Sequence, residues 1–267
     1  MSSPEEGAAG AAAMPLVRAR GITKRFGALT ALQDIDVDIH RGEVLALLGD
    51  NGAGKSTFIK ILAGALPRTA GSLVVDGVET DFASPKDAAE AGIATIYQEL
   101  ALSENLSIAE NVFLGRELTR GAFGLPLLRR TAMRQRVATL LEELDAHISD
   151  PAAPVGSLSG GQRQAVAICR ALDQNAKLVI MDEPTAALAV AETRKVLSLA
   201  TTLARRGCAV VLISHNIADV FEVADRMVVF RRGRKIAEKT RSETDPQDIV
   251  AYITGAHPEL RALETQV

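Results

Sequence analysis

The stretch Gly49-Asp50-Asn51-Gly52-Ala53-Gly54-Lys55-Ser56-Thr57 follows directly on the apolar run from Val44 to Leu48. Two glycines five positions apart, followed by lysine and serine, are the pattern of a strand, a phosphate-binding loop and a helix. Glycine leaves no Cβ between the backbone N–H groups and a phosphate, and the helix start adds its positive dipole end. All nine residues are therefore predicted to bind a nucleoside triphosphate.

Three side chains of this stretch have separate expected tasks. Lys55 can reach the β and γ phosphates, the Ser56 hydroxyl can ligate magnesium, and Thr57 can add a hydrogen bond. The alternative is a glycine-rich loop that only turns a strand into a helix. A chance match in a chain of 267 residues has odds of about one per cent at the average glycine frequency, which favours nucleotide binding.

The composition sets limits on the class of protein. Hydrophobic content of 47% and charged content of 24% are ordinary for a soluble globular protein, and 267 residues suffice for one large domain or two small ones. The net charge of −3 gives no general attraction to nucleic acid, so no nucleic-acid partner is expected. No apolar stretch approaches the ~18 residues that cross a bilayer. Residues 1–15 lack the pattern of a secretory signal and are expected to form a disordered tail.

Apolar periodicity indicates the order of the elements. Alternation from Asp34 to Ile39, with further strands near 73–75 and 93–97, indicates a β-rich N-terminal part. From Ser107 to about Asp150 the spacing is helical, which predicts an inserted helical subdomain. Helices and strands then alternate, with strands at 178–181 and 209–213, so a mainly parallel sheet is expected. The basic run Arg231-Arg232-Gly233-Arg234-Lys235 is interpreted as a solvated turn rather than a polyanion site.

A second motif places two carboxylates at the end of an apolar strand, in Leu178-Val179-Ile180-Met181-Asp182-Glu183. Beside a phosphate-binding loop, Asp182 is expected to support magnesium through a bound water, and Glu183 to orient and polarise the attacking water. The alternative is a strand that ends at the surface in two solvated acids. That arrangement is common in general and is not favoured beside this loop.

A third motif, Leu158-Ser159-Gly160-Gly161-Gln162, begins a helix with Ser159 as a candidate cap. It is a weak signal alone, but the three motifs in this order are specific. Over residues 16–255 the chain resembles the ATP-binding subunit of ABC transporters, whose signature it matches. The resemblance implies an α/β fold of the P-loop NTPase type, with a mainly parallel core sheet, an N-terminal antiparallel β subdomain, a helical subdomain inserted at about 99–176, and a C-terminal tail at 256–267.

The resemblance also implies roles for the remaining motif residues. Two copies of such a subunit sandwich two ATP molecules, and the γ phosphate bound by one copy faces the signature of the other, here Ser159, Gly160, Gly161 and Gln162. Gln98 corresponds to the glutamine that senses magnesium and the attacking water, and His215 to the γ-phosphate histidine. Phe26 occupies the place of the aromatic residue that stacks on adenine, with a core aromatic as the alternative. Where many members have an aspartate that couples the two sites, this chain has Ala189.

Several strings narrow the resemblance to bacterial monosaccharide importers of the ribose, xylose and fructose class, namely Tyr97-Gln98-Glu99-Leu100, Asn105-Leu106-Ser107-Ile108-Ala109-Glu110-Asn111, Phe113-Leu114-Gly115-Arg116-Glu117 and Ser214-His215-Asn216. This class implies ATP and Mg²⁺ as cofactors and two copies of the chain on a separate integral membrane permease. It also implies the cytoplasmic face of the bacterial inner membrane and a separate extracytoplasmic sugar-binding protein. Two rival classes are a soluble ABC-type ATPase acting on DNA or the ribosome, and a regulator that senses ATP without hydrolysing it.

Overall fold

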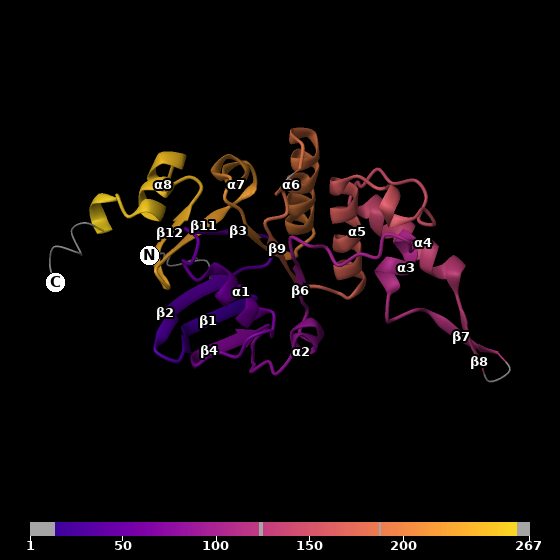
Figure 1. Ribbon diagram of the computed structural model, residues 1–267, viewed down its shortest axis with the longest axis horizontal. Helices are drawn as coiled ribbons and strands as arrows, with labels where there is room; N and C mark the ends of the chain where they lie inside the picture. Colours follow the sequence, from indigo (N-terminus) through magenta and orange to yellow (C-terminus); the bar gives the residue numbers. More distant parts are fainter. Residues whose placement is uncertain (1–13, 123–124, 187, 261–267) are drawn as a thin grey trace, which may run out of the picture.

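The computed structural model describes residues 14–122, 125–186 and 188–260. Its centre is a six-stranded sheet of β3 (Val44–Leu48), β6 (Ile93–Ile96), β9 (Leu178–Asp182), β10 (Ala209–Ile213), β11 (Arg226–Arg231) and β12 (Arg234–Thr240). The order is β12-β11-β3-β10-β9-β6, and only β12 runs antiparallel to its neighbour (Figure 1). The central strands β3 and β10 are buried throughout because elements cover both faces. The expected mainly parallel core sheet is confirmed.

A second sheet of four antiparallel strands covers one side of the core. It consists of β1 (Val17–Phe26), β2 (Leu29–Ile39), β4 (Ala70–Val75) and β5 (Val78–Glu79), in the order β2-β1-β4-β5. Ile35, Val37 and Ile39 are buried on β2, as the alternation predicts. They share a core with α1 (Lys55–Leu62) and with the lower face of the six-stranded sheet. The antiparallel subdomain is thus confirmed, and the helix that follows the glycine-rich loop lies within this core.

Helices cover the other face. The largest apolar cluster joins α3 (Ile108–Phe113), α4 (Arg130–Glu143), α5 (Gly160–Asp173) and α6 (Val190–Arg205), with α3 to α5 at one end of the molecule (Figure 1). A short 3-10 turn, Val155–Ser157, precedes α5. At the opposite end, α7 (Ile217–Val223) and α8 (Pro246–Thr254) pack on β3 and β11, while α2 (Pro85–Glu90) lies beside β6. No helix among the described residues has the length and apolar character of a membrane span.

The helical prediction for 107–150 is wrong in one segment. Strands β7 (Thr119–Ala122) and β8 (Leu125–Leu128) form an antiparallel hairpin between α3 and α4, which projects from the molecule in Figure 1. This stretch contains two glycines and a proline, which disfavour helix. Of the expected tails, residues 1–13 and 261–267 lie outside the described residues. Within 256–260, Leu260 is buried in the cluster that contains α7 and α8.

Asn111 fixes the segment that connects β6 to α3. Its side chain is fully buried, and its Nδ2 donates to the carbonyls of Ser103, Leu106 and Ser107 at 2.9, 3.3 and 3.1 Å. Its Oδ1 accepts from the Ser103 N–H at 2.8 Å. One buried side chain therefore satisfies four backbone groups at the end of this loop.

Replacing Asn111 with alanine should lower the free energy of unfolding by about 1–3 kcal/mol, because half-buried backbone groups lose their partner. Urea denaturation measures the change. The control is Gln135→Ala on the exposed face of α4, which should stay within about 0.5 kcal/mol of the parent chain. Equal losses in the two variants would contradict this role of Asn111.

Candidate nucleotide-binding site

The glycine-rich loop leaves the carboxyl end of β3 in a backbone conformation that leaves no room for a side chain at position 49. Gly49 has φ 142°, and a Cβ there would lie 2.2 Å from the carbonyl oxygen of Phe230 on β11. The neighbouring β11–β12 turn also touches the loop, since the Gly233 N–H donates to the Ala53 carbonyl at 3.0 Å. The predicted turn is present, but Gly233 is buried and packs against the glycine-rich loop instead of facing solvent.

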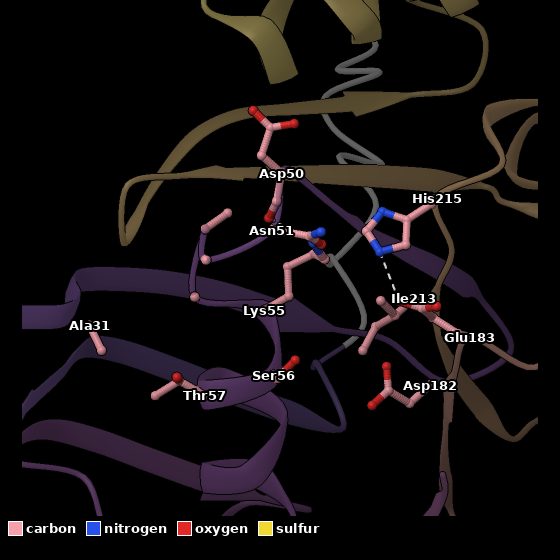
Figure 2. Close-up of a pocket in the computed structure, with 13 residues that line it drawn as sticks. Ala31, Asp50, Asn51, Lys55, Ser56, Thr57, Asp182, Glu183, Ile213 and His215 are labelled. Carbon is pink, nitrogen blue, oxygen red and sulfur yellow. Dashed lines mark hydrogen bonds and ion pairs between the residues drawn. The ribbon is translucent and has the colours of Figure 1, made fainter. Parts of the chain in front are cut away.

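The loop and two other strand ends line one cavity of about 160 Å³. The loop contributes Asp50, Asn51, Gly52, Ala53 and Gly54, and the start of α1 contributes Lys55, Ser56 and Thr57. Asp182 ends β9 and Glu183 follows it, Ile213 ends β10 and His215 lies two residues beyond, and Ala31 belongs to β2. In Figure 2, Lys55 rises from the start of α1 toward the loop, and Asp182, Glu183 and His215 face it from the other side. The fold therefore brings the first two sequence motifs and the predicted histidine together.

Lys55 is the cation of this cavity. Its side chain is buried, and its ammonium donates to the carbonyls of Gly49 at 2.5 Å and Asp50 at 3.0 Å. Burial lowers the pKa of Lys55, while the charges of Glu183, Asp50 and Asp182 act in the opposite direction. A desolvated ammonium that is held by two carbonyls can exchange them for phosphate oxygens, which carry full negative charge.

Asp182 places a carboxylate in the same cavity. Burial raises the pKa of its carboxyl, and the neighbouring charge of Glu183 raises it further. A divalent cation at this place would favour the ionised form. Ser56, exposed at the start of α1, adds a hydroxyl to the same cavity. Mg²⁺ prefers oxygen ligands and usually keeps bound water and substrate phosphates as well. The hydroxyl and carboxylate oxygens of this cavity therefore fit the ion.

Glu183 and His215 contact each other across the strand ends. The His215 Nε2 lies 2.7 Å from Oε1 of Glu183, as the dashed line in Figure 2 marks. Glu183 has φ 50°, a left-handed conformation that is strained for a residue with a side chain. Its N–H donates to the Ile213 carbonyl at 2.9 Å. The strained turn aims the carboxylate at the cavity instead of continuing β9.

Two other predicted residues lie outside this cavity. Gln98 is exposed and lines a neighbouring groove that also contains Glu183 and Gly160. Phe26 is 48% exposed at the end of β1, with the Lys24 ammonium 5.1 Å from its ring centroid. The alternative of a core aromatic is therefore wrong for Phe26, and its contact with adenine stays a prediction.

The signature segment begins α5 as predicted. Ser159 Oγ accepts from the Gln162 N–H at 3.4 Å, and Gln162 Oε1 accepts from the Ser159 N–H at 3.0 Å, a reciprocal cap. Gly160 lines the groove of Gln98, and Gly161 and Gln162 line another cavity beside His147. Among the described residues that line the loop cavity, none belongs to Ser159–Gln162. Within one chain the structure does not bring this segment to the loop.

The sequence matches the family described as ABC transporter over residues 32–186. The chain belongs to the ABC transporter family. Its relatives include the fructose import ATP-binding protein FrcA of Rhizobium meliloti, 48% identical over 91% of this chain and 95% of the relative. The xylose/arabinose import ATP-binding protein XylG of Sulfolobus acidocaldarius is 48% identical over 90% of this chain and 94% of its own length.

A third ABC relative is longer than this chain. The ribose import ATP-binding protein RbsA of Yersinia pestis is 40% identical over 91% of this chain but only 47% of the relative. Among solved structures, the ADP conformation of an ATP-binding cassette of an ABC transporter has 25% identity and a TM-score of 0.74, covering 94% of this chain and 99% of that one. A dimeric cassette bound to ADP and Pi has 26% identity and a TM-score of 0.68, covering 84% and 98%. The predicted ABC ATPase fold is confirmed.

Gln164, which the sequence analysis did not identify, lies beside the turn that carries Glu183. It is 5% exposed on α5, and its Nε2 donates to the Pro184 carbonyl at 3.1 Å, next to Glu183. Its Oε1 is buried without a hydrogen-bond partner among the described residues. The only sequence signal is an amide on the apolar face of a helix, which does not identify its partner 20 residues away.

Ala189, in place of the family aspartate, stands immediately before α6. It has the extended conformation of an N-cap, with φ −67° and ψ 153°, and its carbonyl accepts from Glu192 and Thr193, both at 2.9 Å. Alanine has no side-chain acceptor, so the first N–H groups of α6 lack a side-chain cap. The departure from the family pattern therefore removes a helix cap as well as the coupling carboxylate.

Ala189→Asp should raise the free energy of unfolding by about 1 kcal/mol, because aspartate at an N-cap accepts from free backbone N–H groups. Ala189→Val, which has no acceptor, should give no such gain. Urea denaturation of the two variants and the parent chain, without nucleotide, measures these free energies of unfolding. A gain equal in both variants, or in neither, would contradict the assignment of Ala189 as an uncapped N-cap.

Proposed function

We propose that this chain is the ATP-hydrolysing subunit of a bacterial monosaccharide importer and works as two copies on a separate integral membrane permease. It would act on the cytoplasmic face of the inner membrane, and an extracytoplasmic binding protein would deliver the sugar. The names of FrcA and XylG support the sugar class, and each relative matches nearly end to end. The observation that carries the proposal is the single cavity in which Lys55, Asp182, Glu183 and His215 surround the glycine-rich loop.

Each residue of the cavity has a chemical role in hydrolysis. The backbone N–H groups of 49–57 and the Lys55 ammonium would bind the phosphates. Ser56 and Asp182 would hold magnesium, with Gln98 as a further ligand from the adjacent groove, and the ion when bound neutralises phosphate charge. Glu183 would orient and polarise the attacking water, and accept its proton. In this structure the His215 Nε2 lies 2.7 Å from Oε1 of Glu183. For hydrolysis, His215 must therefore turn away from Glu183 and toward the γ phosphate.

A second copy would complete the site. The capped start of α5, with its two glycines, is suited to approach a phosphate, but within its own chain it lies outside the loop cavity. Two copies arranged head to tail would place Ser159 to Gln162 of one chain against the γ phosphate held by the other. The solved dimeric cassette with ADP and Pi is consistent with this arrangement.

The permease would dock in a groove beside the segment that contains Gln98. This groove of about 330 Å³ lies between α2, β6 and α5 and includes Tyr97, Leu114 and Arg170. Tyr97 is 42% and Leu114 is 47% exposed, so both leave apolar surface open to a partner. Helical loops of a permease could bury them, and motion of the Gln98 segment would then reach the permease.

Glu183→Gln should bind ATP but reduce turnover by about 10²–10⁴-fold, because the amide cannot act as a general base. Lys55→Ala should instead raise the Kd for ATP by about 10–100-fold, since a charge-assisted hydrogen bond is lost. Phosphate release and equilibrium nucleotide binding measure the two effects. Near-normal turnover in both variants would overturn the site assignment.

Leu114→Arg should abolish recovery of the permease, because a charge buried in the contact weakens it by at least about tenfold. The experiment is a mild-detergent pull-down from native membranes with mass spectrometry. Val250→Arg, on α8 at the other end of the chain and 43% exposed, is the matched control and should recover the permease normally. Equal recovery with both variants would refute this docking groove, and recovery of only soluble partners by the parent chain would refute the importer proposal.

A further inference from the structure

Asp219 is a buried carboxylate for which the sequence predicts no role. It lies on α7 and is 8% exposed. Its Oδ2 accepts from the Thr185 hydroxyl at 3.0 Å, and its Oδ1 accepts from the Asn216 Nδ2 at 2.9 Å. Among the described residues no cation forms an ion pair with it. A carboxylate buried with only neutral donors is costly, which calls for a role that alanine or leucine could not fill.

The two donors belong to the two segments that carry the reacting groups. Thr185 stands two residues after Glu183, in the turn where the Ala186 N–H donates to the Glu183 carbonyl at 3.1 Å. Asn216 follows His215 directly and caps α7, accepting from the Ala218 N–H at 3.0 Å. Asp219 therefore ties the turn of Glu183 to the turn of His215, across 34 residues of sequence.

The tie matters most once ATP is bound. Beyond the ends of the paired strands, and in the part of the chain that the structure describes, three polar contacts connect these segments: the His215–Glu183 side-chain pair, the Glu183 N–H to Ile213 carbonyl bond, and the Thr185–Asp219 bond. Under the proposed mechanism the first contact breaks when His215 turns to the γ phosphate. Glu183 also has a strained backbone, with φ 50°, which persists only where neighbours fix it.

We propose that Thr185 and Asp219 form a positioning clamp, which holds the Glu183 carboxylate at its working distance from His215 after their direct contact has broken. Neither residue lines the cavity of the phosphate loop. The clamp faces a cavity of about 410 Å³ that Glu183 and His215 share with Thr185, Asn216 and Asp219, separate from the phosphate loop. Its loss should therefore misplace the general base without changing how the phosphates are held. This inference rests on the proposed role of Glu183.

The test measures phosphate release by the full chain with Mg-ATP. Thr185→Val removes only the hydroxyl that donates to Asp219 and should lower kcat by about 10–100-fold, because small misplacements of a reacting group carry such losses. The KM for ATP should stay within about twofold of the parent value. Thr193→Val is the matched control: Thr193 lines the same cavity, but its hydroxyl makes no hydrogen bond to the described residues, so kcat should be unchanged.

Asp219 variants separate positioning from a general structural role. Asp219→Ala should lower kcat as Thr185→Val does, and the double variant should lose no more than the worse single one. Asp219→Asn, which can still form hydrogen bonds with Thr185 and Asn216, should retain most of the parent kcat. A Thr185→Val variant with kcat within twofold of the parent, or one whose KM rises in proportion, overturns the clamp. If Glu183→Gln itself keeps normal turnover, the proposed site fails first, which distinguishes the two failures.

Discussion

The buried ammonium of Lys55 constrains the whole centre of this molecule. A cation removed from water needs partners, and here they are two carbonyls of the loop that carries it. The loop can turn those carbonyls inward only because Gly49 adopts a φ that admits no Cβ and passes against Phe230. β11 pairs with β3, and the Gly233 N–H donates to the Ala53 carbonyl, so the neighbouring hairpin also packs against this loop. The parallel order of the strands then delivers Asp182 and His215 to the edge where this cation lies.

Under the proposed function, the site is divided between two parts of the fold that one chain does not bring together. The six-stranded sheet supplies the loop, the carboxylates and the histidine, whereas the helical part supplies the capped start of α5. ATP bound between the loop of one copy and the start of α5 of another would hold the two copies together, and hydrolysis would release them. Gln164 connects the helical part directly to the turn of Glu183 through Pro184.

The sequence was most informative where function depends on local backbone geometry. The glycine-rich loop, the carboxylates after β9 and the cap at Ser159 are each contained within a few neighbouring residues, and all three have the predicted local structure. The clamp of Thr185 and Asp219 and the brace of Gly233 could not be predicted, because their partners meet only through the tertiary fold. The β7–β8 hairpin was missed because apolar residues on both sides of it have helical spacing. Gln98 and Phe26 were identified by family resemblance alone, and one chain leaves both outside the cavity.

The central claim is that Lys55 of one copy and Ser159 of another bind the same ATP. The most direct measurement is a structure of the Glu183→Gln chain bound to Mg-ATP, in complex with its permease. The account predicts ATP phosphates on the loop of one copy and against Ser159 to Gln162 of its neighbour, with His215 turned away from position 183. ATP held by the loop of a single chain, with Ser159 facing solvent, would contradict it.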